Sequence, residues 1–306
     1  ANFSGNGLLR KSNMLTLKGE TDMDQYSNIN TPGETNLTIG QNELQEATVI
    51  TNAYSGQYGQ LSGAQVTYVT MSGSNDFHGN LIYYWNGRAV NANDWFNNAT
   101  GAPRPFSNDN QWAGRLGGPI IKNRTFFFVD NEGMRFILPV VSTVTIPTTA
   151  FANAVLANVQ AKQPVEASAY QQMFKLWAGA PGASGAQDLA NSSACSSLSL
   201  PGFNPVTQAC SARFNSNSTA LANEYIVAFR IDQKISDNDN LFFRYKMDRG
   251  DQPTLVDPVN SAFNAISPQP SWDTQLNETH IFNPNLTNSF MATLSHYVEQ
   301  FAQNAG

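Results

Sequence analysis

The clearest pattern in the sequence is an alternation of apolar and polar side chains with a period of two. Between residues 240 and 250 every second side chain is large and apolar: Leu241, Phe243, Tyr245 and Met247. The side chains between them, which include Arg244 and Lys246, mostly carry charge. A strand with this alternation has one apolar and one polar face. Residues 225–231 repeat the pattern, and the polar turn at 236–240 between the two segments predicts an antiparallel hairpin.

Extended segments bounded by turn residues recur over much of the chain. They predict strands near residues 77–86, 110–118, 124–138, 223–235, 239–249, 271–282 and 287–300. The sequence between residues 139 and 222 is instead rich in Ala, Ser, Asn, Gly and Pro. It predicts short helices at 149–160 and 168–177 within a long loop, and long connections of this kind are usually functional or mobile.

The segment 81–85, Leu-Ile-Tyr-Tyr-Trp, places bulky side chains on both faces of one predicted strand. Such a strand has a protein core on both sides, or a core on one side and another apolar phase on the other. Only 13% of the residues are charged and 41% are hydrophobic, yet no run approaches the ~20 apolar residues that a transmembrane helix needs. Dispersed apolar residues with few charges are typical of an exported β protein, including the transmembrane barrel.

Charge and cysteine content narrow the function classes. The net charge is -6, and no cluster of Lys or Arg offers a phosphate-binding stripe, so the sequence excludes nucleic acid as a partner. Cys195 and Cys210 lie in a Ser-rich stretch without other metal ligands. They predict a disulfide within the loop and an oxidising compartment.

Candidate catalytic and metal-binding residues are sparse. His78, His280 and His296 lie far apart in the sequence, and we interpret them as turn or wall residues rather than metal ligands. Asp130 and Glu132 share one strand face, as the carboxylates of a glycosidase could, but no second carboxylate segment accompanies them. A lumen-facing acidic strand is the simpler interpretation. We therefore expect no catalytic residue, no metal site and no cofactor.

Three motifs in order resemble those of a known family. They are "YSGQYGQLSGAQVTYVTMSGSNDFHG", "LGGPIIKNRTFFF" and "RIDQKISDNDNLFFRY". Together they resemble the end of the plug and the first barrel strands of Oar-like TonB-dependent receptors. The resemblance implies a mainly β fold, with a plug remainder at 1–73 and a partial barrel at 74–306 that carries a long loop at about 150–222. One departure is Lys18, which stands where the family usually has Asp in a Leu-Asp-Gly turn.

The resemblance also implies a function. It indicates a receptor in the outer membrane of a Gram-negative bacterium that takes up a scarce ligand with energy from the TonB complex. Its partners would be outer-membrane lipid, an unknown imported ligand, and TonB through a segment outside this chain. Three aromatic side chains of the long loop are the ligand-binding candidates: Tyr170, Phe174 and Trp177. The alternative is a secreted, soluble β-sandwich that acts as an adhesin or binds carbohydrate, and that would bury its apolar strand faces.

Overall fold

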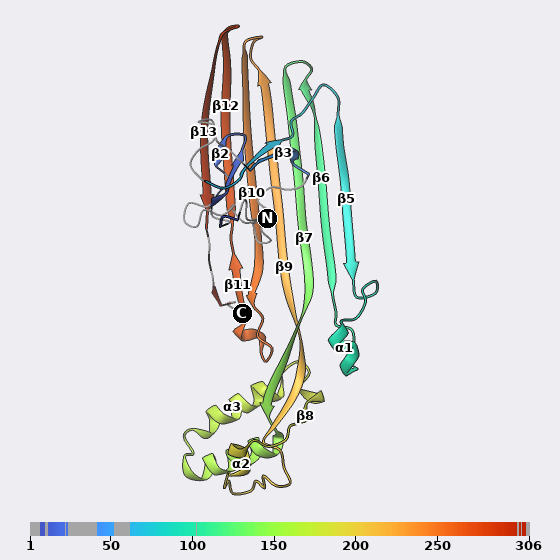
Figure 1. The fold of residues 1–306 in the computed structure, drawn as a ribbon, viewed down its shortest axis with the longest axis vertical. Coiled ribbons are helices and arrows are strands. Elements are labelled where there is room, and N and C mark those ends of the chain that lie inside the picture. Colours follow the sequence, from blue (N-terminus) through green and yellow to red (C-terminus); the bar gives the residue numbers. More distant parts are fainter. Residues whose placement is uncertain are drawn as a thin grey trace.

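A tall antiparallel wall of strands dominates the computed structural model (Figure 1), which describes residues 7–9, 12–21, 23, 42–51, 62–101, 103–298, 300 and 302–303. The strands of the wall follow the order β13-β12-β10-β9-β7-β6-β5, so chain neighbours are also neighbours in space, apart from short β8 and β11. The bounds are β5 (His78–Gly87), β6 (Asn108–Ile121), β7 (Thr125–Pro147), β9 (Ser211–Lys234), β10 (Asp239–Leu255), β12 (Ser271–Asn283) and β13 (Leu286–Tyr297). All the strands predicted from the sequence are confirmed, and the protein is mainly β.

Short elements border the wall. β8 (Gln187–Asp188) pairs with β9, and β11 (Ala265–Pro268) pairs with β10 and with β14 (Ala302–Gln303). The helix α1 (Trp95–Thr100) follows β5, and the 3-10 turn η3 (Ser261–Phe263) precedes β11. In the part of the chain that the structure describes, no helix is both long enough and apolar enough to cross a membrane.

A second, four-stranded sheet is built from the first part of the chain, in the order β2-β1-β4-β3. Its strands are β1 (Met14–Leu17), β2 (Glu20–Thr21), β3 (Leu44–Ile50) and β4 (Gln65–Thr70). Figure 1 shows β2 and β3 across the middle of the wall. The turn between β1 and β2 holds Lys18 at φ 48° and Gly19 at φ 92°, both left-handed. Glycine adopts this conformation without strain, whereas lysine does so at some cost.

The longest strand pair extends well past the others. β7 has 23 residues and β9 has 24, and they pair from Thr125 to Pro147. At about 3.3 Å per residue, β7 spans roughly 75 Å, whereas the apolar band of an outer-membrane barrel is about 25 Å tall. Residues 211–222, which the sequence placed in the loop, therefore belong to a strand. Their Ser- and Asn-rich composition disguised this, because strand formation depends more on pairing than on intrinsic propensity.

This strand pair ends in a small helical segment, which is drawn below the wall in Figure 1. The predicted helices are confirmed as α2 (Thr149–Lys162) and α3 (Ala167–Ala178), followed by η2 (Ala183–Gly185) and α4 (Ser193–Ser196). The Thr148 hydroxyl accepts the Phe151 amide at the start of α2, as an N-cap does. The segment thus has its own folded structure, against the expectation of a mostly irregular loop.

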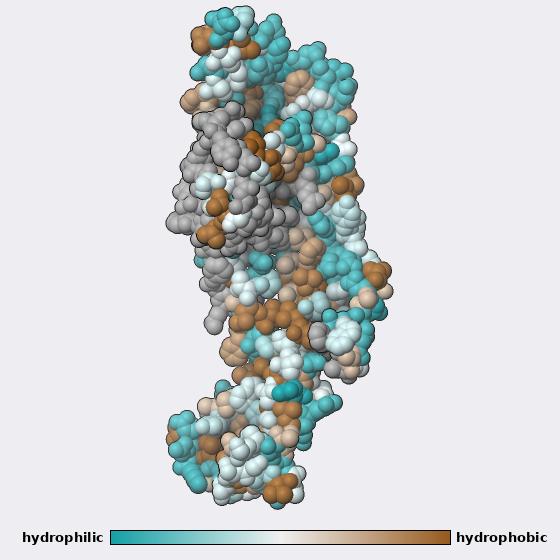
Figure 2. All heavy atoms as spheres, in the orientation of Figure 1, coloured by the Kyte–Doolittle hydropathy of each residue, from teal (hydrophilic) through white to brown (hydrophobic). Residues whose placement is uncertain are grey.

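The wall has an apolar outer face and a polar inner face, as the alternation predicted. Strand register places Phe243 opposite Ile231 and Leu276, and Arg244 opposite Arg230 and Gln275. Large side chains on the outer face remain exposed although they are apolar: Leu81, Tyr83, Trp85, Val129, Ile231, Phe243, Leu276, Phe290 and Leu294. Figure 2 shows the opposite face of the wall, the one that carries the small sheet, where hydrophilic and hydrophobic side chains are mixed. Such an outer face requires an apolar phase against it.

Aromatic side chains of the outer face pair with asparagines on the next strand. The bonds run from Tyr83 Oη to Asn110 (2.6 Å), from Trp85 Nε1 to Asn108 (2.9 Å) and from Trp112 Nε1 to Asn131 (3.1 Å). Gly133 lies directly opposite Trp112, and a Cβ there would come within 2.2 Å of the Trp112 ring. The rings can therefore contact an apolar phase while their polar atoms stay hydrogen-bonded.

Candidate functional site at the contact between the small sheet and the strand wall

One residue of the small-sheet region, Asn42, is hydrogen-bonded to three strands of the wall. Its backbone N–H donates to Glu132 Oε1 on β7 (2.7 Å), and its carbonyl accepts from Arg115 Nη1 on β6 (2.8 Å). Its side-chain amide exchanges two bonds with that of Asn80 on β5 (2.7 and 2.8 Å). All four polar groups of Asn42 are thus used to hold the small sheet against the wall.

The next residue, Glu43, forms a buried ion pair with the wall. Arg244 on β10 donates from Nε to Glu43 Oε1 (2.7 Å) and from Nη1 to Asp273 on β12. The side chains of Arg244 and Glu43 are only 1% and 2% exposed, whereas that of Asp273 is 22% exposed. Two carboxylates from different elements therefore compensate one buried guanidinium.

A second basic side chain of the wall, Arg230 on β9, reaches the end of β4. It donates from Nη1 to the Thr70 hydroxyl (3.3 Å) and from Nε to Asp232 (2.8 Å). Its guanidinium lies 4.1 Å from the centroid of the Phe242 ring, and Lys18 Nζ lies 5.2 Å from the same centroid. Burial, reinforced by the nearby positive charge of Arg230, lowers the pKa of Lys18 to about 8.

Acidic side chains line the inner face beside this contact. Asp130 and Glu132 are both buried there, which confirms the prediction of a lumen-facing acidic strand. Glu224 and Asp248 are buried on the same face. Glu224 belongs to no motif, and the signal that could have indicated its place is its alternation with the apolar side chains that follow it, such as Tyr225 and Val227.

The three aromatic ligand candidates lie on α3 in the helical segment. Tyr170 and Phe174 have ring centroids 6.4 Å apart, and Phe174 and Trp177 have centroids 5.7 Å apart. Trp177 packs against the small core of Ile146 and Phe214. Phe174 and Trp177 border a cavity of about 560 Å³. The structure thus gathers the three rings on one helix, far along the chain from the wall contact.

The two cysteines also lie in the helical segment, where Cys195 and Cys210 form a disulfide with a Cα–Cα distance of 6.3 Å. Cys195 is buried beside Ala154 of α2 and Phe203. The Cys210 carbonyl accepts the Thr148 amide just before α2. The bridge therefore joins α4 to the chain that enters β9.

A strand wall with an apolar outer face, a charged inner face and a small sheet bonded to that inner face is typical of an outer-membrane β-barrel with an occupied lumen. The family described as "Outer membrane beta barrel domain" matches residues 69–306, and the chain belongs to this family. The protein is therefore located in the outer membrane of a Gram-negative bacterium. This overturns the alternative of a soluble secreted sandwich, whose apolar strand faces would be buried.

Two known proteins extend the comparison. Over 90 residues, or 28% of this chain and 8% of the relative, the sequence is 31% identical to the TonB-dependent transporter Oar of Myxococcus xanthus. The crystal structure of the outer membrane transporter YddB from Escherichia coli matches with a TM-score of 0.57 and 8% identity, over 98% of this chain and 33% of that one. The chain thus spans about a third of the solved transporter and a smaller part of Oar. Both relatives are transporters rather than enzymes.

Proposed function

We propose that this chain is part of a TonB-dependent receptor that takes up a scarce ligand across the outer membrane. In this proposal residues 1–73 belong to the plug and residues 74–306 to the barrel, and the helical segment between β7 and β9, residues 148–210, is extracellular. Its partners are outer-membrane lipid, the imported ligand and the TonB complex, and it has neither enzymatic activity nor nucleic-acid binding. The two separate sheets and the match to Oar support this proposal.

The observation that carries the proposal is the polar character of the contact between the small sheet and the wall. Asn42 and Glu43 are held by hydrogen bonds and an ion pair rather than by an apolar core. Water can replace such bonds when the two surfaces separate, so the net free energy lost per hydrogen bond is small, about 0.5–1.5 kcal/mol. A plug held in this way is stable at rest and can still be displaced by a pulling force.

Ligand binding is assigned in this proposal to plug loops together with the helical segment. Tyr170, Phe174 and Trp177 are the aromatic candidates, and the cavity beside Phe174 and Trp177 also has Lys175 in its lining. A cavity of about 560 Å³ is in the range of small-molecule sites. Asp188 lines the same cavity, so aromatic rings beside one cation and one carboxylate suit a ligand that has a flat apolar surface and a polar edge.

The test uses the complete receptor, expressed in host cells with and without TonB on a medium in which both strains grow. Asn42→Cys places a thiol in the contact, and a membrane-impermeant maleimide reports when that contact opens. We expect labelling that is several-fold faster in cells with TonB than in cells without it. Val165→Cys is the matched control because Val165 is 88% exposed in the helical segment, and it should be labelled equally in both strains. Equal, slow labelling of Asn42→Cys in both strains would overturn the proposal.

A further inference from the structure

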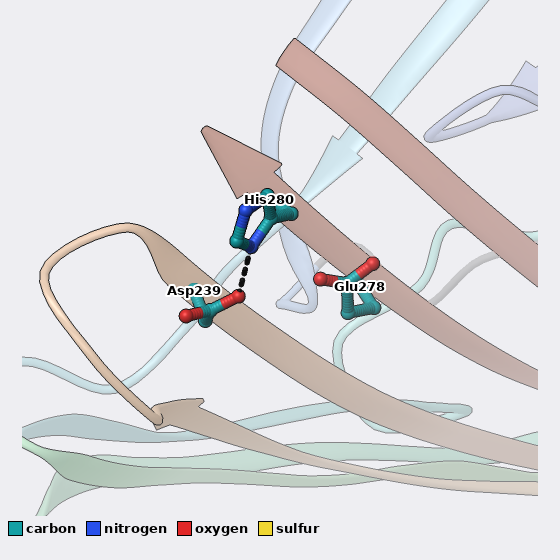
Figure 3. Close-up of side chains that lie close together, drawn as sticks. All are labelled: Asp239, Glu278 and His280. Atoms are coloured by element: carbon teal, nitrogen blue, oxygen red, sulfur yellow. Dashed lines mark hydrogen bonds and ion pairs between the residues drawn. The ribbon is translucent and has the colours of Figure 1, made fainter. Parts of the chain in front are cut away.

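Three potential metal ligands converge at the end of the wall opposite the helical segment. They are Asp239 at the start of β10, and Glu278 and His280 on β12, shown in Figure 3. One ligand atom from each residue lies within 4.8 Å of those from the other two. His280 Nδ1 forms an ion pair with Asp239, and the Glu278 carboxylate points toward the same space (Figure 3).

Strand register accounts for this convergence. Asp239 pairs directly with His280 in the ladder, and Glu278 lies two residues from His280, so all three side chains leave the same face. The Ile281 amide donates to the carbonyl of Asn238 (2.9 Å), which ties the β9–β10 turn to β12. The arrangement therefore belongs to the rigid ladder and not to a loose surface loop.

Neighbouring side chains fix the orientation of two of the ligands. The Ser236 hydroxyl donates to Asp239, and the Phe282 ring lies edge-on to the His280 imidazole with centroids 4.2 Å apart. The side chains of His280 and Asp239 remain 32% and 27% exposed, so an ion can reach them from solvent. The site is thus both preorganised and accessible.

We propose that Asp239, Glu278 and His280 bind a divalent transition-metal ion of the Zn²⁺ type. One imidazole nitrogen and two carboxylate oxygens are ligands that Zn²⁺ accepts, and three protein ligands leave a fourth position for water. The two carboxylates neutralise the ion, and His280 supplies an imidazole nitrogen as the third ligand. The bound ion then joins the β9–β10 turn to β12, so that two successive hairpins are linked at this rim.

Zn²⁺ itself is the probe in the test, which titrates the intact, detergent-solubilised receptor against a chromophoric zinc chelator. The variants His280→Gln and Glu278→Gln each remove one ligand and leave a neutral side chain that can still form hydrogen bonds. His296→Gln is the matched control. His296 is a histidine of the same wall, on β13, but it stacks on Trp272 and does not belong to the cluster. Folding of each variant is checked by the resistance of the barrel to unfolding in detergent on a gel.

We expect the wild-type receptor and the His296 variant to bind Zn²⁺ with the same affinity. Each of the other two variants should bind Zn²⁺ at least tenfold more weakly. Co²⁺ in place of Zn²⁺ should give visible absorption bands of a four-coordinate site in the same two proteins only. Indistinguishable zinc titrations of all four folded proteins would overturn the proposal and leave the contact between His280 and Asp239 as a purely structural feature.

Discussion

Replacing Arg244 with methionine should loosen the small sheet from the wall while leaving the wall itself intact. Methionine keeps much of the length of the side chain but removes the charge that faces Glu43 and Asp273. Glu43 depends on this single partner, since its Oε1 bonds Arg244 and its Oε2 has no hydrogen-bond partner in the described part of the chain. The substitution therefore leaves a buried, uncompensated carboxylate.

The size of the effect follows from this burial. Removing one partner of a buried ion pair costs about 3–5 kcal/mol because the remaining charge stays desolvated. Asp273 adds little to the cost, since its side chain is 22% exposed and water can solvate it. A loss of this size corresponds to a roughly 100- to 4,000-fold larger population of the undocked sheet.

Hydrogen exchange in the intact, detergent-solubilised receptor measures this population directly. Amides of the paired strands β3 and β4 should exchange faster by that factor in Arg244→Met, whereas amides of β9 and β10 should not change. Arg249→Met is the matched control because Arg249 lies on the same strand, in an exposed position on the outer face. Its exchange rates should equal those of the wild type.

A second variant separates the loss of charge balance from a loss of packing. Glu43→Gln leaves Arg244 paired with Asp273 and should cost less, about 1.5–3 kcal/mol for one charge-assisted hydrogen bond. Adding this change to Arg244→Met removes the stranded carboxylate, so the double variant should be more stable than Arg244→Met alone. A double variant that is less stable, or unchanged exchange of β3 and β4 in Arg244→Met, would refute the reasoning.

Four further outcomes are expected in the complete receptor. Phe243→Arg puts a charge on the lipid face and should destabilise the inserted barrel by about 2–4 kcal/mol if it lies near the midplane, as measured by denaturant titration in lipid vesicles. Replacing residues 148–210 with Asn-Gly should preserve barrel assembly but abolish ligand uptake; unchanged uptake would remove the segment from the mechanism. Serine at both Cys195 and Cys210 should destabilise that segment by about 3 kcal/mol, which limited proteolysis reports. Docking of the small sheet should become more favourable as the pH rises from about 8 to 10.5, because docking lowers the pKa of Lys18 and the undocked state therefore binds more protons. Hydrogen exchange corrected for pH measures this dependence, and Lys18→Met should abolish it.

Local pattern was sufficient to predict the wall. The period-two alternation around Phe243 and Arg244 predicted both the strand and the face that each side chain occupies, because one face is apolar and exposed and the other is polar and buried. Residues 211–222 escaped prediction because their strand is specified by pairing with β7 and has no apolar repeat. Composition alone could not distinguish this hairpin extension from a loop.

The candidate site could be predicted only in part. Asp130 and Glu132 share a face by strand parity, and that much is readable from their spacing of two positions. The contact of Glu43 with Arg244 joins residues 201 positions apart, and no local pattern indicates it. Likewise, the sequence shows Glu278 two positions before His280, but Asp239 is 41 positions away and joins them only through strand register.

The charges buried between the small sheet and the wall are better explained by the need to separate the two than by the need to hold them together tightly. Replacing a buried ion pair with well-packed apolar side chains is often neutral or stabilising, so Glu43 and Arg244 do not give the tightest contact this position allows. An apolar contact would, however, expose apolar surface to water each time the sheet withdrew, which costs a free energy of about 25 cal/mol for every Å² exposed. Polar groups such as those of Asn42 exchange their protein partners for water instead. If the sheet moves as proposed, a polar contact lowers the free energy of the open state. This explains why the inner face of the wall carries charge although its outer face is apolar.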